Sequence, residues 1–95
     1  MDFEYDEAKE AANRRRHGLS LSFGARIFDD PDHLVLPTIR EADEEERFKA
    51  IGLVEDKLYT AVHVWRGAAV RFISVRRSND HERRNYRDPG GSFRS

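Results

Sequence analysis

Arginines gather near the C-terminal end of the chain in the stretch "RFISVRRSNDHERRNY", residues 71–86. An apolar alternation typical of a β-strand runs directly into Arg76 and Arg77, and Ser78 can then cap a short polar helix that reaches Tyr86. The planar guanidinium group of arginine matches the oxygens of a phosphate and stays charged, because its pKa lies above about 12. The stretch therefore predicts a surface that binds a polyanion.

Arg76 and Arg77 are consecutive, so in a regular strand their side chains point to opposite faces of the sheet. We expect one of them to bind a phosphate, while the other pairs with Glu82 or with the acidic loop over residues 40–46. Tyr86 follows Glu82 by one helical turn. It either anchors the last helix in the core or presents its phenol to the site.

Histidine is the side chain best suited to proton transfer, because imidazole titrates near neutral pH. His63 lies in the middle of "LYTAVHVW", residues 58–65, the stretch with the strongest strand pattern in the chain. Two interpretations stay open for it: a half-buried histidine satisfied by a backbone carbonyl, or a general acid or base beside the arginines. His17 directly precedes Gly18 at the expected end of a helix, where a histidine is usually a cap.

Other classes of site have no support in the sequence. The absence of cysteine excludes disulfides and thiolate metal sites. The four histidines lack the spacing of a zinc site, and neither a phosphate-binding P-loop nor a G-x-S-x-G nucleophile motif is present. We therefore expect neither a metal nor a cofactor.

The charge of the chain is unevenly distributed although its net value is only −1. Residues 28–57 hold ten acidic and four basic side chains, whereas residues 66–95 hold eight basic side chains, all arginines, and three acids. Either two solvated faces neutralise each other, or the basic region binds a polyanion or a charged protein. The exclusive use of arginine favours a phosphate-containing partner.

The bulk composition indicates one soluble domain with a thin core. Hydrophobic residues make up 38% and charged residues 37% of 95 residues, and no apolar run is long enough to span a bilayer. The acidic start lacks the pattern of a signal peptide, so we expect a cytoplasmic protein without membrane contact. A single domain over residues 1–88 and a flexible tail over 89–95 are predicted.

Local signals predict the order β-α-α-β-β-β-β-α, an α+β domain with helices packed on a mainly antiparallel sheet. Asp6 is expected to cap the first helix and Gly18 to end it. Ser20 can cap a second helix with Leu21, Ala25 and Phe28 on one face. The strands are predicted over 3–6, 33–39 (an edge strand because of Pro37), 47–54, 58–65 and 70–77.

Strand alternation also distributes the basic side chains between the two sheet faces. Arg47 and Lys49 share a face of one strand, while in the last strand Arg71 shares a face with Arg77 and Arg76 lies on the opposite face with Phe72. The side of the sheet that the helices leave open would then be a shallow cationic surface suited to a nucleic-acid backbone.

From Phe3 to about Tyr86, the chain resembles the BrnT family of type II toxins, which are small RelE-like ribonucleases. The likeness rests on the order and spacing of six short stretches: "YDEAK", "NRRRHGLS", "ARIFDDP", "EERFKAIG", "VRFISVRR" and "ERRNY". The resemblance implies a RelE-like fold and metal-independent RNA cleavage that inhibits translation. It also implies a DNA-binding BrnA-type antitoxin, in a heterotetramer of two toxins and two antitoxins that contacts DNA only through the antitoxin.

RNA supplies its own nucleophile, the 2′-hydroxyl, so the enzyme has to move protons and stabilise the phosphorane. The catalytic residues expected from the resemblance and from this chemistry are His63 for acid–base work, Arg76 and Arg77 for the phosphorane, and Tyr86 for orienting the phosphate or stacking on a base. The expected RNA-binding residues are Lys9, His17, Arg47 and Arg71. The alternatives are a non-catalytic nucleic-acid-binding module and a protein-interaction domain.

Overall fold

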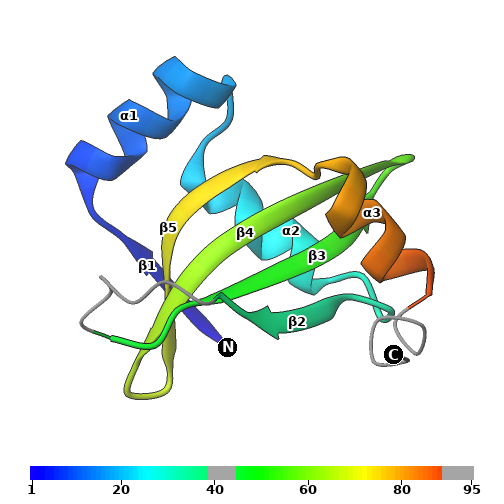
Figure 1. Ribbon diagram of the computed structural model, residues 1–95. Coiled ribbons are helices and arrows are strands. Elements are labelled where there is room, and N and C mark those ends of the chain that lie inside the picture. Colours follow the sequence, from blue (N-terminus) through cyan, green and yellow to red (C-terminus); the bar gives the residue numbers. More distant parts are fainter. Residues whose placement is uncertain (39–44, 89–95) are drawn as a thin grey trace.

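The computed structural model describes residues 1–38 and 45–88. A five-stranded sheet with the order β1-β5-β4-β3-β2 forms its centre, and only β1 runs parallel to its neighbour β5 (Figure 1). Along the chain the elements are β1 (Asp2–Tyr5), α1 (Glu7–His17), the 3₁₀ turn η1 (Leu21–Phe23), α2 (Gly24–Phe28), β2 (Leu34–Pro37), β3 (Phe48–Val54), β4 (Lys57–Arg66), β5 (Ala69–Arg77) and α3 (Asp80–Arg87).

The predicted α+β class with a mainly antiparallel sheet is confirmed, and β2 is an edge strand as expected from Pro37. The predicted loop over 40–46 falls mostly outside the described residues, and the predicted tail over 89–95 lies wholly outside them. In the part of the chain that the structure describes, no helix has the length and apolar character needed to cross a membrane.

α1 begins and ends where the sequence predicts. The Asp6 carboxylate accepts a hydrogen bond from the backbone N–H of Ala8 at 2.9 Å, and Gly18 ends the helix in the left-handed region with φ 70°. Glu7 and Glu10 lie in the first turn, and Arg14, Arg15, Arg16 and His17 lie in the last, which suits the helix dipole. These local interactions explain why α1 is predictable from its sequence.

A buried amide that the sequence analysis missed fixes α1 against the sheet. Asn13 donates from Nδ2 to the backbone oxygens of Leu19 and Val75 at 2.9 and 2.8 Å, and its Oδ1 accepts from the backbone N–H of Val75 at 3.0 Å. An asparagine within a helix of alanines and charged residues was the available signal. Because these bonds join residues far apart in sequence, α1 has a fixed position beside β5.

The buried side of the second helical segment differs from the prediction. Its buried positions are Leu21, Gly24 and Ile27, whereas Leu21, Ala25 and Phe28 were expected to share the core face. The first turn is a 3₁₀ turn, in which positions three apart align, so the spacing of three replaces the expected α-helical spacing of four.

A β-bulge between β4 and β5 breaks the alternation predicted for β5. Val62 pairs with Ser74 and His63 pairs with Phe72, so Ile73 has no counterpart on β4. Phe72 consequently lies in the same buried cluster as Val75, although strict alternation would place them on opposite faces. The predicted face assignments along β5 are therefore wrong beyond the bulge.

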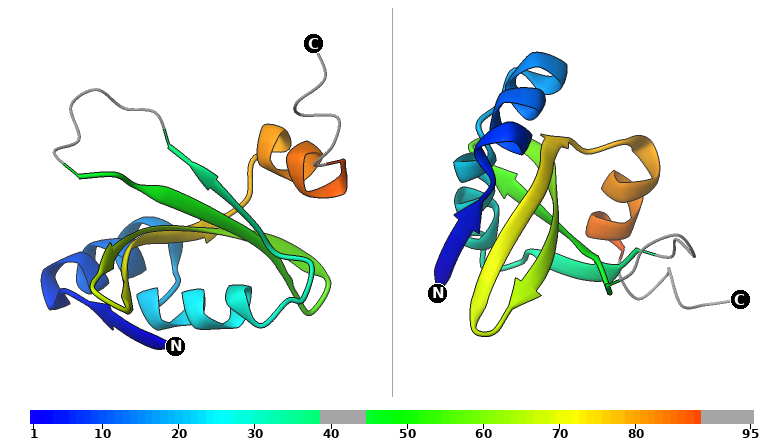
Figure 2. Two further views of the ribbon diagram at one scale, coloured as in Figure 1. Left: turned by 90° about the horizontal axis from the view of Figure 1, so that it is seen from below. Right: turned by 90° about the vertical axis from the view of Figure 1, so that its left-hand side faces the viewer.

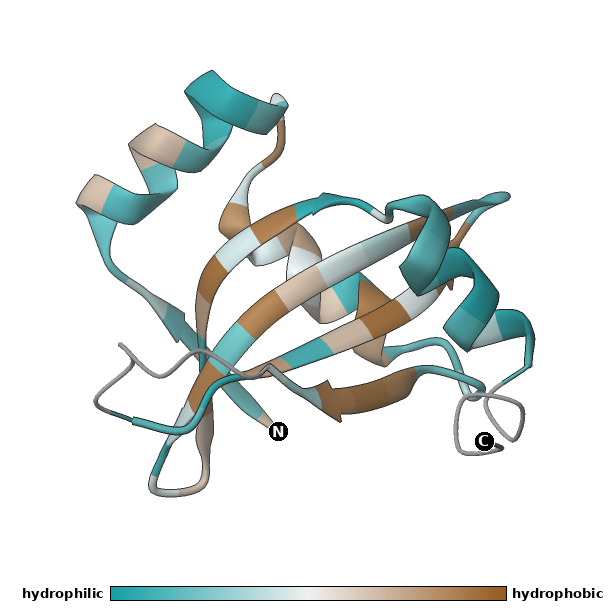
Figure 3. Cartoon of the chain, in the orientation of Figure 1, coloured by the Kyte–Doolittle hydropathy of each residue, from teal (hydrophilic) through white to brown (hydrophobic). Residues whose placement is uncertain are grey.

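α2 and α3 lie on opposite faces of the sheet (Figure 2). Apolar residues are concentrated in the strands, and α3 is polar along its whole length (Figure 3). Asn79, rather than the predicted Ser78, caps α3, and it forms a reciprocal capping box with Glu82. Ser78 is buried instead, with its hydroxyl 2.8 Å from that of Thr60.

Candidate nucleic-acid interface

The face of the sheet opposite α2 carries two adjacent hollows beside α1. The His63 ring contacts Phe28 of α2 on one face, so Val62 and Val64 point to the other face, where they line the hollows. The hollows have volumes of about 400 and 220 Å³ and share Lys9 and Arg47. We call the two adjacent hollows together the cationic groove after their basic lining residues, namely Lys9, Arg16, His17, Arg47, Arg66 and Arg71.

All four residues expected to bind RNA lie in the cationic groove. Lys9 and His17 project from α1, Arg47 immediately precedes β3, and Arg71 lies on β5. Three separate segments thus bring positive charge to one solvent-accessible surface.

Two further basic residues of the cationic groove, Arg16 and Arg66, were missed by the sequence analysis. A signal for Arg16 was present, because Lys9, Ala12, Asn13 and Arg16 follow the i, i+3, i+4, i+7 spacing of one helix face. Because Asn13 is buried against β5, this face of α1 points toward the sheet.

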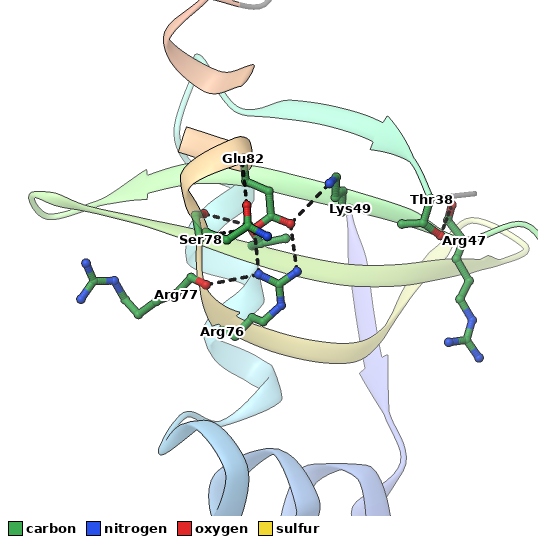
Figure 4. A network of polar contacts seen from close by, with 9 residues as sticks. Thr38, Arg47, Lys49, Arg76, Arg77, Ser78 and Glu82 are labelled. Carbon is green, nitrogen blue, oxygen red and sulfur yellow. Dashed lines mark hydrogen bonds and ion pairs between the residues drawn. The ribbon is translucent and has the colours of Figure 1, made fainter. Parts of the chain in front are cut away.

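At the border of the cationic groove, an acidic residue pairs with one of its arginines, and backbone hydrogen bonds hold another arginine in place. Glu45 lies 3.2 Å from the Arg66 guanidinium group in an exposed pair, and exposed pairs contribute little to stability. The backbone of Arg47 is held at the edge of the sheet, because Thr38 donates to its carbonyl oxygen from both its N–H and its hydroxyl, at 2.9 and 3.3 Å (Figure 4).

Arg76 forms a bidentate ion pair with Glu82 of α3. Its Nη1 donates to Oε1 at 2.7 Å and its Nη2 to Oε2 at 2.9 Å (Figure 4). The same carboxylate accepts from the Thr60 hydroxyl at 3.0 Å and from Lys49 at 3.4 Å, and its side chain is 1% exposed. One of the two alternatives from the sequence, an arginine paired with Glu82, is therefore realised by Arg76.

Glu82 is an anion at neutral pH. Burial acts to raise its pKa, but the hydrogen bonds from the Arg76 guanidinium group and from the backbone of Asn79 outweigh this effect and lower the pKa to about 2. The carboxylate is therefore a fixed negative charge that orients Arg76. Its occupied oxygens make it unsuited to take a proton from a substrate.

Arg77 points away from Arg76 (Figure 4). Its guanidinium group lies 5.5 Å from the centre of the Tyr59 ring, in a cation–π contact. It lines a separate hollow of about 330 Å³, together with Lys57, Arg83 and Tyr86. The structure therefore does not bring Arg76 and Arg77 to one ligand, as strand alternation already suggested.

His63 is buried on the α2 side of the sheet with 0% exposure. Its Nδ1 lies 3.1 Å from the carbonyl oxygen of Ala61, and the rings of Phe28 and Phe48 pack nearby. Burial lowers its pKa, against the hydrogen bond with Ala61, so the imidazole is held neutral. Of the two interpretations left open by the sequence, the geometry fits the histidine that contacts a backbone carbonyl, but the ring is fully rather than half buried, and its Nε2 has no hydrogen-bond partner among the described residues.

Tyr86 contacts the segment that follows α2 and does not line the cationic groove. Its hydroxyl donates to Oδ2 of Asp30 at 2.5 Å. Burial and this negatively charged acceptor raise the pKa of Tyr86 to about 12. The same carboxylate oxygen accepts from the backbone N–H of Leu53, so Asp30 links α3 to β3.

Replacing Tyr86 with phenylalanine is expected to lower the free energy of unfolding by about 1–2 kcal/mol, because Asp30 loses a hydrogen bond. RNA cleavage per folded molecule is expected to stay within about twofold of the original rate, since the hydroxyl points away from the cationic groove. Urea unfolding and a cleavage assay measure the two effects separately. A large loss of cleavage with unchanged stability would show that Tyr86 acts in the reaction.

Within residues 1–38 and 45–88, no group of three or more histidine or acidic side chains is arranged to hold a metal ion. The basic residues of the cationic groove are suited instead to anionic oxygens.

Residues 5–82 match the sequence model of a family described as a ribonuclease toxin, BrnT, of type II toxin–antitoxin systems. This chain belongs to the BrnT family. The resemblance seen in the sequence is thereby confirmed, and the family implies a ribonuclease with an RNA substrate and an antitoxin partner. A comparison with curated proteins gave no match. The part that matches the BrnT family includes the whole cationic groove and Glu82, and it ends before Tyr86.

Proposed function

We propose that this BrnT family member is a metal-independent endoribonuclease that binds RNA along the cationic groove. The observation that carries the proposal is the convergence of Lys9, Arg47 and Arg71 from three separate segments on one accessible depression. Basic side chains arranged along a depression attract a phosphate backbone and release its counterions.

Cleavage would proceed by attack of a ribose 2′-hydroxyl on the adjacent phosphorus, giving a 2′,3′-cyclic phosphate and a 5′-hydroxyl. Guanidinium groups stabilise the negative charge that develops on the phosphorane. Arg76 lines neither hollow, but it lies near enough to the cationic groove for its charge to act on His17. It is suited to this role because its Nη1 donates to Glu82 and to the Arg77 carbonyl oxygen and its Nη2 to Glu82, while no hydrogen bond of the described residues uses its Nε. His63, Arg77 and Tyr86 have no place in this proposal, since their side chains point elsewhere.

The expected physiological role is that of a cytoplasmic RelE-like toxin that cuts RNA and so inhibits translation. Its antitoxin would be of the BrnA type, in a complex of two toxins and two antitoxins that reaches DNA only through the antitoxin. Silencing by an antitoxin segment that covers the cationic groove is consistent with its exposed basic residues. A complex that leaves Lys9, His17 and Arg71 open to solvent would argue against that mode of inhibition.

The test incubates purified protein, freed of antitoxin, with end-labelled RNA in the presence of EDTA. The wild type is expected to cleave, and Lys9→Ala/Arg16→Ala is expected to cleave at least about tenfold more slowly, because two phosphate contacts are lost. The matched control, Arg15→Ala/Arg84→Ala, removes two exposed arginines that line neither hollow, and its rate should stay near that of the wild type.

The same cleavage assay also distinguishes a ribonuclease from the two alternative functions. Intact RNA with a salt-sensitive gel shift would support the non-catalytic nucleic-acid-binding module. The absence of both cleavage and binding would leave the protein-interaction domain.

A further inference from the structure

We infer that His17 is the general base of the proposed cleavage and removes the proton from the attacking 2′-hydroxyl. This assignment rests on the proposed ribonuclease function and goes beyond the phosphate-binding role that the sequence predicts for His17.

His17 lies where a bound phosphate would meet the end of α1. It is the last residue of α1, and its exposed side chain lines the larger hollow together with Lys9 and Arg16. Gly18 turns the chain away in a left-handed conformation directly after it, so the terminal turn leaves the imidazole accessible. A phosphate bound in this hollow would lie within reach of the ring.

The other three histidines lie outside the cationic groove. His63 is fully buried on the opposite face of the sheet. The Nδ1 of His33 lies 2.8 Å from the carbonyl oxygen of Asp30, away from the cationic groove. His81 is exposed on α3 and lines neither hollow. Among the four histidines of the chain, only His17 lies in the cationic groove.

The surroundings of His17 favour its neutral form. Burial and the positive charges of Arg16 and Arg76 lower the pKa of His17. The other charged side chains that line its hollow, Lys9 and Arg47, are also basic. The dipole at the C-terminal end of α1 acts in the opposite direction, but this effect is small and screened at an exposed helix end. The imidazole is therefore mostly neutral near pH 7, the form that a general base requires.

The reaction balances with water as the only co-reactant. A neutral imidazole nitrogen of His17 takes the 2′ proton while the 2′ oxygen bonds to phosphorus. The bond between phosphorus and the 5′ oxygen breaks, the electron pair leaves with that oxygen, and the oxygen takes a proton from water. The imidazolium then releases its proton, which neutralises the hydroxide and restores the base.

The test measures single-turnover cleavage of end-labelled RNA in EDTA between about pH 5 and about pH 8. Wild-type, His17→Ala and His17→Gln proteins are compared with the control His81→Gln. The wild-type rate should rise with pH below the pKa of His17 and level off above it, because only the neutral form accepts a proton. Loss of the base should slow cleavage by about 10²–10⁴-fold and abolish this pH dependence.

Two further readouts separate catalysis from structure and binding. Added imidazole should restore part of the cleavage rate of His17→Ala but not accelerate the wild type. RNA affinity of His17→Gln, measured by filter binding, should stay within about threefold of the wild type, as its amide still donates a hydrogen bond. The control His81→Gln should match the wild type in every measurement.

The assignment is overturned if the wild type cleaves and His17→Gln cleaves with the same rate and pH profile. It is also overturned if cleavage falls only in proportion to RNA affinity and imidazole restores nothing, which would leave His17 a phosphate-binding residue. A wild type that binds RNA but never cleaves it would contradict the ribonuclease proposal itself, and the base would then have no reaction to serve.

Discussion

Replacing Glu82 with alanine is expected to lower the free energy of unfolding by about 3 kcal/mol, which weakens the folding equilibrium more than 100-fold. The carboxylate is buried, and it binds Arg76 at 2.7 and 2.9 Å, the Thr60 hydroxyl and the first turn of α3. Its removal takes the main acceptor from a partly buried guanidinium group and leaves the buried Thr60 hydroxyl with the Ser78 hydroxyl, at 2.8 Å, as its remaining partner.

Urea denaturation of the two proteins measures this difference. The matched control is Glu55→Ala, since the Glu55 side chain is 78% exposed and lies 3.6 Å from Arg26 in a surface pair. The control should change the free energy of unfolding by less than about 1 kcal/mol. Equal effects of the two substitutions would show that the buried pair contributes no more than a surface pair.

The same carboxylate sets the expected response to acid. The pKa of Glu82 is lowered from 4.5 to about 2 in the folded protein, so its contribution is complete above about pH 4.5 and is lost as the pH falls toward about 2. Glu82→Gln removes the titrating group and should lose less stability than the wild type across this interval. If the free energy of unfolding fell equally with pH in the wild type and in Glu82→Gln, the lowered pKa of Glu82 would be contradicted.

Because of this ion pair, the substitution Arg76→Ala is expected to affect stability as well as activity. It would leave the Glu82 charge buried, with Lys49 at 3.4 Å as its remaining cationic partner. A loss of toxicity in that variant therefore needs a stability measurement beside it. The double variant Arg76→Ala/Glu82→Ala should be less destabilised than the sum of the two single changes.

Reversing two charges in the cationic groove, Lys9→Glu/Arg16→Glu, is expected to weaken RNA binding at least about 100-fold at low salt. Two attractive phosphate contacts become repulsive, so the slope of log affinity against log salt should become shallower by at least about 1.4 for single-stranded RNA. Fluorescence anisotropy over a range of salt concentrations measures both quantities. A non-cleavable RNA with 2′-deoxy substitution keeps binding separate from cleavage.

The control Arg15→Glu/Arg84→Glu changes the net charge equally, but these exposed arginines line neither hollow. It should weaken binding far less than the reversal in the cationic groove. An equal loss in both variants would mean that RNA responds to the overall charge of the protein and that no particular surface binds it.

The sequence by itself determined the elements whose signals are local. Asp6 and Gly18 mark the ends of α1 because a cap bonds to backbone groups within the adjacent turn. The strands follow from period-two alternation, and Pro37 marks an edge because it lacks a backbone N–H. The ordered motifs were sufficient to place the chain in the BrnT family.

Only the tertiary structure decided which side chains share the candidate site. The bulge at Ile73 depends on pairing with a distant strand, so alternation within β5 could not reveal it. The burial of His63 follows from the position of α2, and the cationic groove exists because Asn13 holds α1 beside Val75. Local rules extend over a few residues, whereas these contacts join residues separated by tens of positions, and packing decides among the faces that the sequence leaves open.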